Sequence, residues 1–156
     1  LYFARDFDGA IAKCLKVIEM DPNFAEAYEY LKRSYDQKGM YREAISARQK
    51  RRKILSRETR DTAALRIAAS TTNSRLYWQK RLELEIEESK QDQLSAFEMA
   101  EILAQLGEKD RALDWLVQAH AQRHFMIMYL KVAPNLDPLR SDPRFVNLVG
   151  RIGLPQ

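Results

Sequence analysis

The chain has 156 residues, a net charge of +4 at pH 7, 46% hydrophobic residues, and only five glycines and five prolines. This composition excludes a disordered chain and fits one domain or a short array of repeats. No apolar run approaches the ~18–20 residues that a membrane-spanning helix requires, and the single cysteine, Cys14, excludes an internal disulfide. We therefore expect a cytoplasmic protein. Because the chain begins at Leu1, within a helical pattern, we also expect it to be part of a longer protein.

The positive charge is concentrated in one segment. Residues 48–57 contain six basic residues and no acidic residue, and removing these six leaves 20 basic and 22 acidic residues. The basic character therefore belongs to one predicted helix and not to the whole surface.

A small residue that follows a turn recurs at multiples of 34 residues. Ala10, Ala44 and Ala112 each stand near the start of an amphipathic helical pattern, and 34 and 68 residues separate them. We interpret residues 1–24 as a partial repeat unit, in which Pro22 closes the unit because proline cannot continue the preceding helix.

Residues 25–58 form the clearest unit. Its large residues occupy the positions expected between paired helices, and Gly39 suits a left-handed helix cap. We expect Ala44 here and Ala112 in a later unit to lie at close helix–helix contacts. Four large residues should be buried beside them: Leu31, Tyr35, Leu103 and Leu116.

Residues 59–92 keep the length of a unit but lose its pattern. Arg66 stands where other units have a small residue, and Trp78 replaces the close-contact alanine. Helices are still predicted over about 58–70 and 76–88, with wider or shifted packing.

The pattern returns in residues 93–126, at Met99, Ala100, Leu103, Gly107, Ala112, Leu116 and Ala119. Residues 127–156 are then rich in proline. Asp142-Pro143 predicts a helix start, with the acid as N-cap and proline at the first helical position. The short helix that follows has one apolar face, formed by Phe145, Leu148, Val149 and Ile152.

The 34-residue spacing and the large–small pattern resemble the tetratricopeptide repeat family. That resemblance implies an all-α fold, a right-handed α-α superhelix (a solenoid) of antiparallel helix pairs, with the proline-rich segment as its C-terminal cap. Stretches 106–116, 136–145 and 152–155 also resemble the C-terminal regions of large bacterial regulatory proteins. In those proteins the repeats follow a winged-helix, serine/threonine kinase or cyclase domain, often with TolB-like segments. The resemblance implies a non-catalytic interaction or scaffolding module in signalling or transcription regulation.

The family resemblance also implies a binding groove lined by the first helix of each unit. Its partner would be a protein or peptide, or another domain of the same protein, and an unused groove is the alternative. The acidic and apolar character of the groove suggests a basic or amphipathic segment as ligand. The residues expected to line it are Glu26, Glu29, Arg33, Asp36, Ile67, Phe97 and Glu101.

The alternative function is nucleic-acid binding through the basic helix 48–57, since clustered lysine and arginine displace counterions from phosphates. No aromatic residue alternates with the charges to stack on bases, which favours a solvated helix face instead. The possible phosphate contacts are Arg48, Lys50, Arg51, Arg52 and Lys53.

Other residue types offer weaker candidates. His120 and His124 have the i,i+4 spacing of two metal ligands, but no third ligand is evident in the sequence. Cys14 lies on an apolar stripe and is interpreted as a core residue. The sequence therefore predicts no catalytic residue, no metal site and no cofactor.

The start of the chain suggests one further property. Residues 1–20 lack the helix that would cover their apolar face in a complete unit, and Leu1, Tyr2 and Phe3 are expected to be uncovered. An uncapped end of a repeat array favours association. We therefore expect self-association through residues 1–20.

Overall fold

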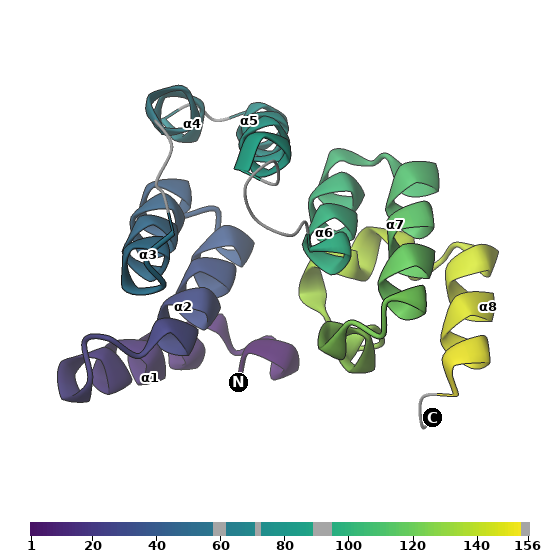
Figure 1. The fold of residues 1–156 in the computed structure, drawn as a ribbon, viewed down its shortest axis with the longest axis horizontal. Helices are drawn as coiled ribbons and strands as arrows, with labels where there is room; N and C mark the ends of the chain where they lie inside the picture. Colours follow the sequence, from purple (N-terminus) through teal and green to yellow (C-terminus); the bar gives the residue numbers. More distant parts are fainter. Residues whose placement is uncertain (58–61, 71–72, 89–94, 154–156) are drawn as a thin grey trace. The chain divides into compact units, whose positions relative to one another are not determined.

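The computed structural model describes residues 1–57, 62–70, 73–88 and 95–153. Every regular element in these ranges is helical, which confirms the all-α prediction. The α-helices are α1 (Phe7–Met20), α2 (Ala25–Gln37), α3 (Tyr41–Ile54), α4 (Ala63–Ala69), α5 (Ser74–Glu88), α6 (Ala96–Leu106), α7 (Lys109–Ala121) and α8 (Pro143–Ile152). Three short 3-10 helices are η1 (Tyr2–Ala4), η2 (Phe125–Tyr129) and η3 (Pro134–Leu139). Figure 1 shows their succession along the chain.

The chain divides into two compact units, Leu1–Tyr77 and Trp78–Gln156, and the division falls within α5. Of the unit boundaries expected from the sequence, 25 coincides with the first residue of α2, whereas 59 and 93 lie outside the described residues. The boundary at 127 falls within η2. The two units are described separately below.

In the first unit, α2 packs against both α1 and α3. Tyr28, Leu31 and Ala47 form a buried cluster between these helices. The partly buried side chains against this cluster are Ile11, Cys14, Ile18, Tyr35 and Ile54. Leu31 is therefore buried as predicted, whereas the prediction for Tyr35 was wrong in degree, because its ring reaches the edge of the cluster and remains half-exposed.

The turn between α2 and α3 explains why these helices can pack closely. Gly39 adopts a left-handed conformation with φ of 69°, which a residue without Cβ reaches without strain. The chain then reverses, and Ala44 on α3 is fully buried, as predicted for a close helix contact.

The N-terminal end differs from expectation at Tyr2. Its side chain is buried in an aromatic cluster with Phe3, Phe7 and Tyr30, whose ring centroids lie 5.1–6.0 Å from the Tyr2 centroid. The prediction that Tyr2 is uncovered was wrong because η1 folds it back onto these rings, while Leu1 remains exposed as expected.

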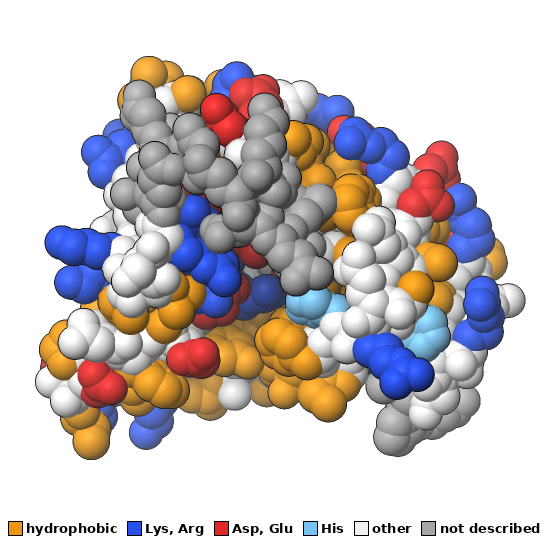
Figure 2. Space-filling view, viewed as in Figure 1, with side chains coloured by type: hydrophobic (Ala, Val, Ile, Leu, Met, Phe, Trp, Pro, Cys, Tyr) orange, Lys and Arg blue, Asp and Glu red, His pale blue; other side chains and the backbone are white. Residues whose placement is uncertain are grey.

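Helix α1 nevertheless leaves much apolar surface uncovered. Ala10 is its only buried residue, and Leu15, Val17 and Met20 are exposed. Hydrophobic side chains accordingly gather over α1 in the space-filling view (Figure 2).

In the second unit, α6 and α7 form a closely packed pair. Ser95 caps α6 by accepting a hydrogen bond from the Glu98 N–H, and Gly107 ends the helix with φ of 79°. The interior of this pair contains Leu103, Ala112 and Leu116, all fully buried as predicted.

The C-terminal segment covers one side of α6 through η3. Leu130, Leu136 and Leu139 are fully buried, and the Arg140 guanidinium donates to the backbone carbonyls of Lys131 and Ala133. The Ala133 carbonyl also accepts from the Leu136 N–H, so Arg140 adds a second donor there and supplies one to Lys131.

Helix α8 confirms the predicted start. The Asp142 carboxylate accepts a hydrogen bond from the Arg144 N–H at 2.9 Å, Pro143 occupies the first turn, and Gly153 ends the helix. Phe145 and Leu148 are buried, while Val149 and Ile152, at the edge of the same face, are half-buried.

Within the described residues, every helix is too short or too polar to cross a lipid bilayer.

Candidate binding groove between α3 and α4

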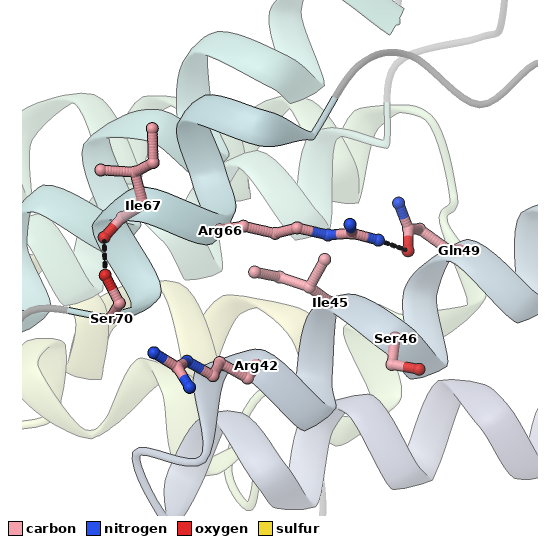
Figure 3. A pocket seen from close by; sticks show the side chains of 7 residues that line it. All are labelled: Arg42, Ile45, Ser46, Gln49, Arg66, Ile67 and Ser70. Carbon is pink, nitrogen blue, oxygen red and sulfur yellow. Dashed lines mark hydrogen bonds between the residues drawn. The ribbon is translucent and has the colours of Figure 1, made fainter.

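A groove of about 510 Å³ opens between α3 and α4 in the first unit. Figure 3 shows the side chains that line it. They are Arg42, Ile45, Ser46 and Gln49 from α3, and Arg66, Ile67 and Ser70 from α4 and its C-terminal end.

The α3 side of the groove follows from helix periodicity. Its four residues stand at i, i+3, i+4 and i+7, which places them on one face of the helix. This face adjoins the stripe of Ala44, Arg48 and Arg52, which is buried. One side of α3 therefore packs into the helix pair, and the neighbouring side faces the groove.

Isoleucine side chains supply the apolar part of the groove. Ile45 is 1% exposed and forms the floor, whereas Ile67 on α4 is 68% exposed. In Figure 3 the Ile45 side chain points from α3 into the space between the helices. A partner that covers Ile67 would remove apolar surface from water, which is the main favourable term in association.

The positive charges of the groove have no opposing carboxylate among the described lining residues. Arg42 makes no ion pair or hydrogen bond with any residue that the structure describes. The Arg66 guanidinium donates to Gln49 Oε1 at 3.0 Å, and the other end of the Gln49 amide donates to Thr62 Oγ1 at 2.6 Å. Gln49 thus holds the Arg66 guanidinium beside α3 without neutralising it.

The groove expected from the sequence has a different composition. Of its seven predicted residues, Ile67 lines the observed groove and Glu26 is exposed on α2. Arg33, Asp36, Phe97 and Glu101 are buried, so the prediction that they form an open binding surface was wrong.

Glu29 explains part of this difference. Its carboxylate is half-buried and attracts three cations, Lys32 Nζ at 3.0 Å, Arg33 Nε at 2.7 Å and Arg51 Nε at 3.3 Å. The Arg51 contact is close enough for an ion pair but is not aligned as a hydrogen bond. Glu29 therefore links α2 to α3 through the Arg51 ion pair.

Asp36 has a similar internal role. It accepts a hydrogen bond of 2.7 Å from the Tyr77 hydroxyl, and the Tyr77 ring stacks on Tyr41 with centroids 4.0 Å apart. A buried carboxylate requires such partners, because burying an unpaired charge costs several kcal/mol.

The fold buries some basic residues of the segment 48–57 and exposes others. Arg48 and Arg52 are 6% and 8% exposed, and Arg51 pairs with Glu29. Lys50 and Lys53 are exposed on α3. The interpretation of the whole segment as a solvated face was therefore wrong for Arg48 and Arg52, which share the stripe of Ala44.

The histidine pair is split between two environments. His120 is exposed, whereas the His124 ring lies between Phe97 and Phe125. His124 Nδ1 accepts a hydrogen bond from the Met126 N–H, and Nε2 lies 3.4 Å from Ser95 Oγ. His124 is thus part of the packing around η2. No group of three or more possible metal-ligating side chains occurs in the described part of the chain.

Cys14 is half-buried against the Tyr28 cluster, close to its predicted place in the core. Burial raises the pKa of its thiol, which lowers the thiolate fraction at neutral pH. Burial also raises the pKa of the neighbouring Tyr35, with a smaller contribution from Glu43.

A second groove, of about 490 Å³, lies between α7 and α8 in the second unit. Its polar residues include Asp114, Arg144, Asn147 and Arg151. Arg144 is paired with Asp142 at 2.8 Å and with Asp110 at 2.7 Å. Hydrogen bonds from the Arg144 side chain and backbone lower the pKa of Asp142 to about 2.

Arg42, Ile45 and Gln49 were not predicted as groove residues. One available signal was their i, i+3, i+7 spacing beside the buried Ala44 stripe. Another was Arg66, a large charged residue at a position that the repeat pattern reserves for a small one. Comparisons of the chain with protein-family models, curated proteins and solved structures find no match.

Proposed function

We propose that this chain is a non-catalytic protein-interaction module that holds a segment of a partner protein in the α3–α4 groove. The observation that carries the proposal is the combination of an exposed Ile67, an apolar floor at Ile45 and arginines without opposing carboxylates among the described lining residues. Exposed apolar surface beside uncompensated charge is typical of an interaction site.

The proposal extends to the parent protein. The helix pairs α2–α3 and α6–α7 support a tetratricopeptide-like solenoid with the 127–156 segment as its cap. On that basis we propose a cytoplasmic module at the C-terminal end of a bacterial signalling or transcription-regulatory protein. The partner would be a separate protein or another domain of the same protein.

Nucleic-acid binding through α3 remains the rival function, because Lys50 and Lys53 are exposed on that helix. Three of the five residues proposed for it are less suited to phosphate. Arg48 and Arg52 are buried, and Arg51 already faces the Glu29 carboxylate. Of the five, the two exposed lysines give a weaker electrostatic footprint than five clustered cations would.

A peptide-display selection on the immobilised chain tests the proposal. Peptides enriched on the native chain should bind in solution by fluorescence anisotropy, and Ile67→Ala should weaken them because it removes exposed apolar contact while preserving helix propensity. Val146→Ala, at a 60% exposed position on α8, is the matched control and should have no effect.

The rival function predicts the opposite pattern. Retention of duplex DNA would depend on Lys50 and Lys53 and be unaffected by Ile67→Ala. A selection that enriches no peptide, together with lysine-dependent DNA retention, would replace the proposal with its rival.

A further inference from the structure

We infer that the α3–α4 groove selects an acidic amphipathic helix, with acidic, aliphatic and acidic side chains at positions i, i+3 or i+4, and i+7. The inference rests on the proposed function and adds the chemistry of the partner. It follows from the spacing of charge and apolar surface along α3.

The two positive charges lie toward opposite ends of the groove. Arg42 and Gln49 are seven residues apart on α3, which corresponds to ~10 Å along a helix axis. The Arg66 guanidinium is held at the Gln49 end by a hydrogen bond of 3.0 Å. Ile45 stands between these two ends and points into the groove (Figure 3).

A helix that lies along α3 would match this spacing with its own repeat. Acidic residues at i and i+7 are also separated by ~10 Å, and a residue at i+3 or i+4 lies between them on the same face. An aliphatic side chain at that middle position would cover Ile67 and reach toward Ile45. Partner helices commonly bind grooves through anchors at these positions.

The charge of the groove favours carboxylates as the polar contacts. Two guanidinium groups line it, and none of the described lining residues is acidic. A guanidinium presents paired N–H donors that match the two oxygens of a carboxylate. Arg66 uses one hydrogen bond to Gln49, which fixes its direction and leaves further donors for a ligand.

The apolar surface favours a protein segment over a nucleic acid. Ile67 is 68% exposed within the groove, and covering it requires an apolar side chain. The described lining contains no aromatic ring on which a base could stack. A phosphate backbone would satisfy the arginines but would leave Ile67 against charged oxygens.

The test uses a fluorescent helical peptide of about 20 residues, built on the i, i+4, i+7 pattern with glutamate, leucine and glutamate. A second peptide replaces both glutamates with lysine. Binding is measured by anisotropy for the native chain and for Arg42→Gln and Arg66→Gln. Arg111→Gln is the control, because Arg111 is an exposed arginine that pairs with Glu108 outside the groove.

The acidic peptide should bind the native chain and the control equally. Each groove variant should bind it roughly three- to tenfold more weakly, and raised salt should weaken the native complex, as expected for partly exposed charge pairs. Gln49→Leu should weaken binding in the same direction, because the Arg66 guanidinium loses the amide that positions it. Circular dichroism of each variant confirms that the helices are intact.

Three results would overturn the inference. The lysine peptide could bind as well as the acidic peptide, the acidic peptide could bind both arginine variants with native affinity, or neither peptide could bind at all. In each case, display-selected peptides that depend on Ile67 would keep the proposed function and remove only the acidic-helix specificity. Displacement of the acidic peptide by duplex DNA, with loss of DNA binding in Arg42→Gln, would overturn both.

Discussion

The two grooves of this molecule have similar volumes, about 510 Å³ between α3 and α4 and about 490 Å³ between α7 and α8, yet their charges are arranged differently. Each is lined by two arginines. In the first, no described lining residue is acidic, whereas in the second Arg144 is paired with Asp142 and Asp110. The two grooves therefore differ in the balance of their charges and not in their size.

The largest expected effect concerns the helix pairs on which the grooves are built. Ala44 on α3 and Ala112 on α7 are both fully buried, so Ala44→Leu and Ala112→Leu should each overpack a close helix contact. The expected loss of stability is about 1–3 kcal/mol for each variant. Thermal unfolding would show it as a decrease of roughly 2–4 °C per kcal/mol.

Ala121→Leu is the matched control, because Ala121 is exposed at the end of α7. If both buried variants unfolded at the native temperature, the two grooves would not rest on close-packed helix pairs and the 34-residue register would be wrong.

The next largest effect should come from converting the second groove into one like the first. Replacing Asp110 and Asp142 with asparagine removes both partners of Arg144, and Asp114→Asn removes the carboxylate from the groove lining. Asparagine at 142 preserves the N-cap of α8. This triple variant should bind the acidic helical peptide on the order of tenfold more tightly at the second groove, measured by anisotropy in an Arg42→Gln, Arg66→Gln background. An unchanged affinity would show that charge balance does not distinguish the grooves.

Acid should also affect the two grooves differently. The pKa of Asp142 is about 2 in the folded protein and 3.8 in its ordinary environment, so the folded state favours the ionised carboxylate. This contribution is complete above pH ~4 and is lost as the pH falls toward ~2.

An NMR titration can follow this change at the Arg144 amide, which donates to Asp142. The amide should titrate with a midpoint near the folded pKa, and Asp142→Asn should abolish that transition. The Arg42 resonances should not follow it, since the described lining of the first groove contains no carboxylate. A shared midpoint at both places would contradict the separation of the grooves.

The smallest expected effect concerns a third surface, the exposed apolar side of α1. Met20 is 80% exposed at the end of α1, and Leu15 and Val17 are exposed on the same helix. We predict weak self-association through residues 1–20, detectable by light scattering at high micromolar concentration. Met20→Ser should reduce it and Val146→Ser should not. A strictly monomeric native chain would remove this prediction.

The fold was predictable where a local rule decided the structure. Gly39 permits the left-handed turn, Ala44 and Ala112 permit close packing, and Asp142 with Pro143 starts a helix by its own chemistry. Each of these features depends on a few neighbouring residues. The 3-10 helices η2 and η3 were harder to predict from the sequence. They depend on buried leucines and on hydrogen bonds from Arg140 to the backbone, which join residues that are not neighbours in the chain.

The groove was predictable only in part, because it depends on which face of α3 meets α4. Ile67 was identified from its position in the repeat, whereas Arg42 and Gln49 were not. Arg48 and Arg52 show the same limit. Because they are charged, both arginines were expected to be exposed. Successive steps of four residues from Ala44 place them on the buried side of α3, where the aliphatic carbons of their side chains can pack.

The open position of Arg42 and Arg66 has a kinetic consequence. Charges at the rim of a binding surface act on approaching partners over roughly 8–10 Å in physiological salt, before any contact forms. They therefore increase the rate of encounter more than the lifetime of the complex. Burial of Ile67 by the proposed partner would act only after contact and would slow dissociation. In the proposed complex, the two arginines would therefore act mainly on the association rate and Ile67 mainly on the dissociation rate.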